Sequence, residues 1–196
     1  MRRSTTVAFL ALGAALVGLV LATVVQRLNT KSQAPRTTAA ASPQVAPLHW
    51  REVYGNKREH IVFGVRRFEV LPNGWRANVS LTNDTPVPYE VGDPRTTLDR
   101  AFGLMLFDSG SASDLKKRNS SQTLPAPRAA TGYKPGLPDV LQPGASWQGT
   151  ISARGPLVAG SFVRFVFGTL VAVGRTPDVL AERVVWITDH AYRLRA

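Results

Sequence analysis

The stretch LPDVLQPGASWQGTISA, from Leu137 to Ala153, decides the fold, because a proline-rich turn leads directly into a strict alternation of side chains. Trp147 and Ile151 fall on one side of an extended chain, and polar residues alternate with them. A slip of one residue would turn every side chain of such a strand to the opposite face. Pro143 presets φ and Gly144 tolerates a positive φ, so the turn predicts a register in which Trp147 enters a core.

Two further alternating segments precede this strand. HIVFGVRRFEVL (residues 60–71) and WRANVSLTN (residues 75–83) flank a Pro-Asn-Gly turn, and Asn-Gly between apolar runs is a strong hairpin signal. The apolar face of the first segment changes at Arg66-Arg67, which predicts a β-bulge. The second alternates cleanly, which predicts one packed and one solvated face.

Later segments complete the pattern of an all-β domain. GLMLFD, FVRFVFGTLVAV and RVVWITD each predict a strand, and Gly168 predicts a bend or bulge in the second of them. No window predicts a convincing amphipathic helix. Six to eight short strands separated by turns predict an antiparallel immunoglobulin-like (Ig-like) β-sandwich over residues 48–196.

The N-terminal residues form an uncharged, mostly apolar run instead of an alternating pattern. Ser4 to Gln26 carry no charge over 23 residues, about 35 Å of helix, which suffices for a hydrocarbon core of roughly 30 Å. This predicts a signal-anchor transmembrane helix in residues 1–28, with Arg2 and Arg3 favouring a cytoplasmic N-terminus. Residues 29–47 are rich in Pro, Ala and Thr and predict a disordered tether. The alternative is cleavage near Ser42 and secretion.

A long polar segment interrupts the sandwich between residues 109 and 139. It holds a single aromatic residue, Tyr133, and four prolines. Segments of this length without secondary structure are usually functional or disordered, so we expect a long flexible loop. Adjacent cations in this loop, Lys116, Lys117 and Arg118, are candidate contacts for an anionic polymer or lipid headgroups.

Charge and residue types exclude several classes of function. The chain carries a net charge of +11, but from Glu52 onward 18 basic residues stand against 13 acidic ones, and this moderate excess does not indicate a nucleic-acid partner. The absence of cysteine removes disulfides, thiolate metal sites and cysteine nucleophiles. His49, His60 and His190 lack metal-ligand spacing, and FDSGSASD (residues 107–114) lacks the oxygen ligands of a cation loop. We expect no catalytic, cofactor-binding or metal-ligating residues.

Several turn and core motifs are shared with a known group of proteins. VSLTN ends a strand in Asn83 before a polar turn, LQPG (residues 141–144) precedes a strand with a central Gly149, and FVRFVFG is rich in Phe and Val. In these features residues 58–190 resemble bacterial membrane-anchored or secreted proteins with an Ig-like domain of unknown function. The resemblance implies an Ig-like sandwich and no particular activity. The long segment at 109–139 departs from the family's compact pattern.

Taken together, these features predict a non-catalytic, envelope-exposed interaction or accessory module. We expect a single pass through the cytoplasmic membrane, the C-terminal domain outside, and a protein partner in the envelope. The alternative is binding of anionic cell-wall polymer or lipid headgroups through Lys116, Lys117 and Arg118. A third hypothesis is an enzyme whose site is not visible in the sequence.

Overall fold

The computed structural model describes residues 39–92, 102–176 and 178–196, which form an antiparallel, two-sheet β-sandwich with one α-helix. The predicted all-β sandwich is thus confirmed. The predicted membrane anchor (residues 1–28) and the first part of the predicted tether lie outside the described residues. Among the residues that are described, none belongs to a helix long and apolar enough to cross a membrane.

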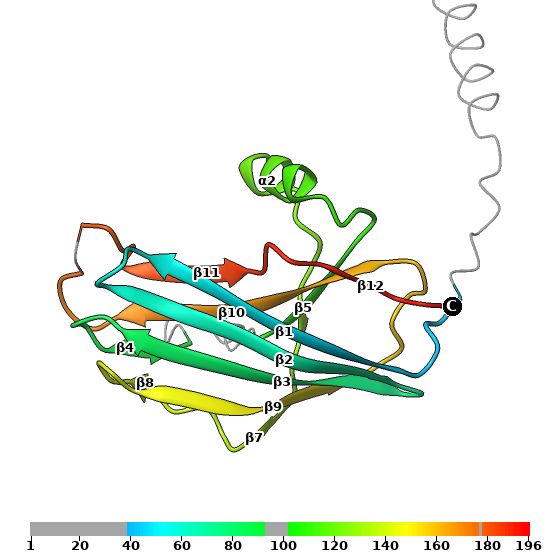
Figure 1. The fold of residues 1–196 in the computed structure, drawn as a ribbon, viewed down its shortest axis with the longest axis horizontal. Helices are drawn as coiled ribbons and strands as arrows, with labels where there is room; N and C mark the ends of the chain where they lie inside the picture. Colours follow the sequence, from blue (N-terminus) through cyan, green and yellow to red (C-terminus); the bar gives the residue numbers. More distant parts are fainter. Residues whose placement is uncertain (1–38, 93–101, 177) are drawn as a thin grey trace, which may run out of the picture. The chain divides into compact units, whose positions relative to one another are not determined.

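The first sheet has five strands in the order β1-β2-β3-β9-β7 and faces the viewer in Figure 1. Its strands are β1 (Gln44–Gly55), β2 (His60–Leu71), β3 (Gly74–Asp84), β9 (Ser146–Arg154) and β7 (Gly132–Lys134). The expected hairpin joins β2 to β3, where Leu71 pairs with Gly74. Gly74 is needed there because a Cβ atom would collide with the carbonyl of Ala153 on β9.

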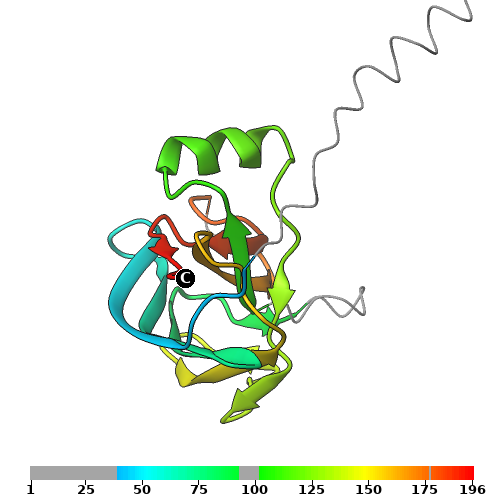
Figure 2. The ribbon, with the colours of Figure 1, turned by 90° about the vertical axis from the view of Figure 1, so that its right-hand side faces the viewer.

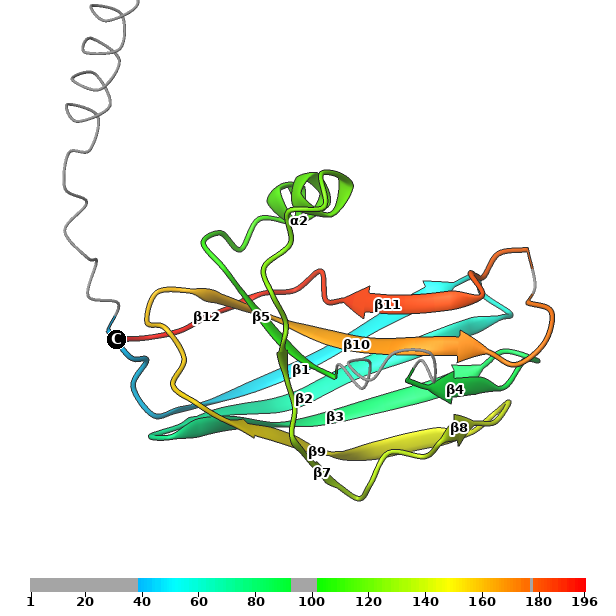
Figure 3. The same ribbon diagram turned by 180° about the vertical axis from the view of Figure 1, so that it is seen from behind.

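The second sheet is built around β10 (Phe162–Ala172) and is seen from behind in Figure 3. Along one edge, β10 pairs with β5 (Gly103–Phe107) and β4 (Tyr89–Val91). On their outer sides, β5 pairs with β6 (Arg128–Ala129) and β4 pairs with β8 (Val140–Leu141). Along its other edge it pairs with β11 (Arg183–Ile187) and then β12 (Tyr192–Arg193). Strands β11 and β12 follow one another along this edge and are separated by residues 188–191.

The core lies between the two sheets and is rich in aromatic rings. Phe63 of β2 stacks on Trp186 of β11 at 5.5 Å, and Phe68 meets Phe165 edge-on at 5.4 Å. Trp147 and Ile151 are buried, as their alternation predicted. Complete burial of one such side chain contributes about 1.5–3 kcal/mol, so these cross-sheet contacts hold the two layers together.

Both predicted irregularities are present. In β2 the register shifts between Val65 and Arg67, which turns Phe68 and Val70 into the same core that Val65 enters. In β10 the pairing with β11 is interrupted around Gly168, whose φ is 133°. A bulge inserts an extra residue and bends the strand, so that β2 buries apolar side chains both before and after the bulge.

The sandwich begins earlier than the sequence predicted. Residues 44–47, placed in the tether, belong to β1, and the amide of Ala41 donates a 2.8 Å hydrogen bond to Leu157. The Gln44 amide oxygen accepts hydrogen bonds from the Tyr192 hydroxyl and the Arg195 amide. The prediction was wrong because it weighed only apolar side chains, whereas strand pairing uses backbone groups that every non-proline residue carries.

The predicted flexible loop at 109–139 is also wrong. The segment contains helix α2 (Ala112–Ser120), which stands outside the two sheets in Figure 2. It also contains β6 and β7, which belong to the sheets. Leu115 and Ala130 are buried, and Tyr133 packs against the core. Leu115 is the buried residue of this short helix. A single apolar residue produces no repeating apolar pattern in the sequence, so the helix could not be predicted from periodicity.

Candidate functional site

A groove of about 490 Å³ lies between helix α2 and strand β11. Its apolar floor includes Leu115 of α2 with Val185 and Ile187 of β11. Lys116 and Asp189 bring charge to its lining. The complete lining is Ala112, Leu115, Lys116, Asn119, Val185, Trp186, Ile187 and Asp189. An apolar concave surface with a few polar groups is the usual form of a binding site, which makes this groove the candidate site.

Helix α2 is held on the outer face of the second sheet by a small apolar cluster. Leu115 packs there with Met105 and Phe107 of β5 and Val166 of β10. Along the helix, Arg118 Nε donates to the Asp114 carboxylate four residues earlier at 3.0 Å. Pairs at this spacing add a few tenths of a kcal/mol, so the packing of Leu115 is the main anchor of the helix.

Arg164 joins the two walls of the groove. Its buried guanidinium donates to the carbonyls of Gly110 and Ser111, which precede α2, at 2.8 and 3.1 Å. On the other side it donates to the carbonyls of Thr188, at 2.8 Å, and Asp189, which follow β11. Only arginine offers so many donors in a rigid fork. One side chain therefore sets the separation of α2 and β11.

The environment of this guanidinium is unusually dry for a cation. Burial lowers the pKa of Arg164, and the negative charges of Asp189, Glu52 and Asp114 oppose that shift. The ring of Phe107 lies beneath the guanidinium at 5.6 Å. Removing a cation from water costs much free energy unless it has partners. We infer that the four carbonyls and the Phe107 ring offset this desolvation cost for Arg164.

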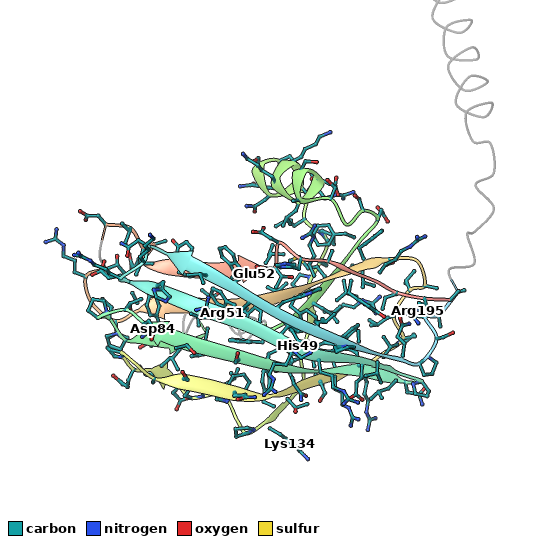
Figure 4. All side chains as sticks on the ribbon, in the orientation of Figure 1. His49, Arg51, Glu52, Asp84, Lys134 and Arg195 are labelled. Carbon is teal, nitrogen blue, oxygen red and sulfur yellow. The ribbon has the colours of Figure 1, made fainter. Side chains whose placement is uncertain are left out.

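Glu52 joins the groove to the first sheet. It lies on β1, is 7% exposed, and its carboxylate accepts four hydrogen bonds. They come from Trp186 Nε1 at 2.7 Å, the Asp189 amide at 3.0 Å, and the His190 amide and Nδ1 at 3.1 and 2.7 Å. Figure 4 shows Glu52 near the edge of the sandwich. The carboxylate thus clamps the linker between β11 and β12 and orients Trp186.

The pair of Glu52 and His190 has part of the geometry of a catalytic triad. The carboxylate fixes the imidazole through Nδ1, and the ring stacks on Trp50 at 5.4 Å while half exposed. An orienting carboxylate and an imidazole need a nucleophile as a third member. Within the described ranges, no hydroxyl group is hydrogen-bonded to the His190 ring, and no cluster of three His, Asp or Glu side chains could hold a metal ion.

The outer edge of β11 is a further feature of this site. In the part of the chain that the structure describes, β11 pairs with β10 alone. Val185, at its middle, is 54% exposed and lines the groove. A strand edge presents N–H and C=O groups to any extended segment that approaches. The groove and the edge together can bind a strand from another chain.

The cations singled out from the sequence lie on α2 rather than on a loop. Lys116 and Lys117 are exposed, and Lys116 lines the groove. Arg118 is half-buried and paired with Asp114 and, at 3.7 Å, with Asp108. The structure therefore leaves two of the three cations exposed for a ligand.

The sequence did not single out Arg164 or Glu52. A lone arginine inside the apolar run FVRFVFG was the available signal for Arg164, because a charge at a strand position between apolar residues needs a dedicated partner set. No local pattern marks Glu52, whose partners lie 134 or more residues away. Of the other histidines, His60 pairs with Asp84 at 3.4 Å and His49 is exposed on β1.

Comparison of the chain with known protein families, curated proteins and solved structures finds no match. The fold itself defines the class as an antiparallel two-sheet β-sandwich. Within that class, this chain carries a helix-bordered groove beside an edge strand.

Proposed function

We propose that this chain is a non-catalytic interaction or accessory module that binds a protein partner through the groove between α2 and β11. The observation that carries the proposal is the exposed Val185 on an edge strand, beside an apolar groove whose two walls are fixed by Arg164. Rigid walls lower the ordering cost of binding. The site is therefore suited to recognition.

The occupant that fits this site is an extended segment of a protein partner. Its backbone would pair with the outer edge of β11, and an apolar side chain would lie on Val185, Ile187 and Leu115. Lys116 on the groove and Lys117 beside it favour acidic residues on the α2 side of the segment. The occupant is thus a strand with apolar residues on one face and at least one carboxylate.

The setting we propose is the cell envelope. The uncharged run from Ser4 to Gln26 supports a single-pass anchor in the cytoplasmic membrane, and Arg2 and Arg3 support an external C-terminal domain. Assignment of the sandwich to the Ig-like group rests on the turn motifs around Asn83 and Gly144. Secretion after cleavage is the alternative, and a mature N-terminus near Ser42 in culture fluid would establish it.

Binding of anionic polymer or lipid headgroups through Lys116, Lys117 and Arg118 is less well supported. Arg118 is shared between two carboxylates, which leaves two exposed lysines on a nine-residue helix. Each such cation contributes about 1 kcal/mol near a charged surface. An enzyme remains the third hypothesis, and the oriented imidazole of His190 is the group on which it would depend.

The test is site-specific photocrosslinking in the native host. A photoreactive residue replaces Val185 in the full-length chain, and a matched variant carries it at Val173, an exposed valine (46%) just after β10. We expect one discrete protein adduct from position 185 and none from 173. A peptide copy of the crosslinked segment should bind the wild-type chain and lose at least tenfold in affinity with Lys116→Glu. Equal crosslinking from both positions, or none from 185, would contradict the proposal.

A further inference from the structure

The outer face of the five-stranded sheet is rich in basic and hydrogen-bonding side chains. Strand pairing sets its residues in rows that cross the sheet. One row runs from Arg51 through Gly64 and Ser80 to Gln148, and the next from Arg67 through Asn78 and Thr150 to Lys134. Because the period of a strand is two, these residues all lie on the face opposite the core. In Figure 4 this face is toward the viewer, with His49, Arg51 and Lys134 labelled.

Positive charge dominates this surface, which we call the basic face. It carries two carboxylates, Glu69 and Asp84, and six positively charged side chains. The six are Arg51, Arg66, Arg67, Arg76, Lys134 and Arg154. All six are exposed. Clustered cations of this kind raise the local concentration of anionic ligands.

The two carboxylates of the basic face are already engaged. Glu69 is paired with Arg67 at 2.8 Å and with Arg76 at 2.6 Å, and its side chain is only 11% exposed. Asp84 pairs with His60. Among the described residues, no carboxylate lies within 4.0 Å of the side-chain nitrogens of the other four cations, Arg51, Arg66, Lys134 and Arg154. Those four have their charge available to a ligand.

Hydroxyl and amide groups fill the space between the cations. Ser80 lies over Gly64, where any Cβ atom would collide with its Oγ, and Asn78 and Thr150 form a 3.3 Å pair. At one end a hollow of about 520 Å³ is lined by residues that include Thr131, Ser152 and Arg154. The exposed apolar side chains of this face, Val45, Val53 and Leu71, lie at its margins.

We propose that the basic face binds a linear phosphate polymer whose repeats carry hydroxyl groups, such as a polyol phosphate. Four strand spacings of about 4.8 Å separate β1 from β7, so cations extend over roughly 19 Å across the sheet. This spread matches a ligand with several charges in series rather than one small anion. Hydroxyl and amide groups between the cations suit a polyol. A lipid surface would call for large apolar side chains at the centre of the face, and the centre is polar.

This site is separate from the groove of the proposed function. It lies on the first sheet, whereas the groove is bordered by α2 and β11 of the second. A partner protein and a phosphate polymer would therefore bind to different faces. Either proposal can fail while the other stands.

The test measures binding of synthetic poly(glycerol phosphate) to the full-length chain in an uncharged detergent. The variant is Arg51→Glu, Lys134→Glu and Arg154→Glu together, and the matched control is Arg58→Glu, Arg175→Glu and Arg193→Glu, also three exposed cations. We expect the basic-face variant to bind at least tenfold more weakly. The slope of log affinity against log salt should fall in magnitude by about 2–3, and the control should keep most of its affinity.

Several outcomes would overturn the proposal. If both triple variants weaken alike, net charge rather than the basic face decides binding. If the basic-face substitutions weaken binding to vesicles containing phosphatidylglycerol more than they weaken binding to the polymer, the face is a membrane surface. Far-UV circular dichroism and urea unfolding of each variant check that it is folded. The corresponding Gln triple should show an intermediate loss, and a Gln triple with wild-type affinity would contradict the inference.

Discussion

The side-chain amide of Asn83 donates a 3.0 Å hydrogen bond to the main-chain carbonyl of Leu141, 58 residues further along the chain. The same amide donates to Val87 at 2.8 Å, and its oxygen accepts from the amide and hydroxyl of Thr85. The Gly144 amide in turn donates to the Asn83 carbonyl at 2.7 Å. One fully buried side chain thus joins the end of β3 to the turn that starts β9.

Replacement of Asn83 by alanine should lower the free energy of unfolding by about 2–4 kcal/mol. The substitution removes the amide donor of the Val87 and Leu141 carbonyls and the acceptor of the Thr85 amide, although the Thr85 hydroxyl still donates to Val87. Buried groups left unsatisfied cost about 1–3 kcal/mol each before relaxation. Asn78→Ala, on the exposed face of the same strand, is the control and should change stability by about 0.5 kcal/mol or less. Equilibrium urea unfolding measures both. Equal effects at the two positions would show that Asn83 is not a structural centre.

Residues 111–130 should not be removable, in contrast to what a flexible loop would allow. A Gly-Ser link in their place removes Leu115 from its cluster and deletes β6. We expect a loss of about 3 kcal/mol or more, comparable to the 3–5 kcal/mol expected for Trp147→Ala in the core. Urea unfolding of both variants decides the point. A deletion that costs less than about 1 kcal/mol would restore the interpretation as a dispensable loop.

Arg164→Met should destabilise the domain by about 3–5 kcal/mol, because four carbonyls lose their donor in a buried setting. The matched control is Arg193→Met, whose guanidinium also lies over a ring, that of Phe162, and is exposed. It should cost less than about 1 kcal/mol. Thermal and urea unfolding give both values. Hydrogen exchange should show the greatest loss of protection in α2 and β11. A uniform loss across both sheets would argue against a role of Arg164 in holding α2 and β11 together.

Tyr89→Phe should be neutral or stabilising at pH 8, since the buried hydroxyl has no hydrogen-bond partner among the described residues. Burial raises the pKa of Tyr89 above its ordinary value of 10.0, and Tyr54 adds to the shift. The folded state therefore keeps this proton where the unfolded chain loses it, so stability falls as the pH rises above about 10. Unfolding at pH 8 and pH 10.5 should show a smaller fall in the variant than in wild type. An identical fall would contradict the assignment.

A fragment of residues 39–196 should be more stable than one of residues 48–196. The shorter fragment lacks the pairs that residues 44–47 of β1 make with β2, and the hydrogen bonds of Gln44 to the C-terminal end. Both fragments should give a β-rich far-UV spectrum. The midpoint of urea unfolding should be higher for the longer one. Equal midpoints would mean that the extra residues contribute nothing to the sandwich.

Much of the fold follows from local pattern. Alternation predicted the buried faces of β3 and β9, the change of face at Arg66-Arg67 predicted a bulge, and Gly168 predicted an interruption in β10. These features are readable because a strand's side-chain period is a property of the backbone alone. The Pro143-Gly144 turn was likewise readable, since each residue has its own restriction on φ, and Gly144 has a φ of 72°.

The candidate site and the order of the strands were decided only by the tertiary structure. Glu52 meets His190 across 138 residues, and Arg164 meets Gly110 across 54, so no window of sequence contains either relationship. The basic face likewise arises from the pairing of five strands, which aligns single cations that stand far apart in the chain. Short-range pattern reports which way a side chain points, whereas the partner it meets depends on how distant strands pack, and that depends on the whole core at once.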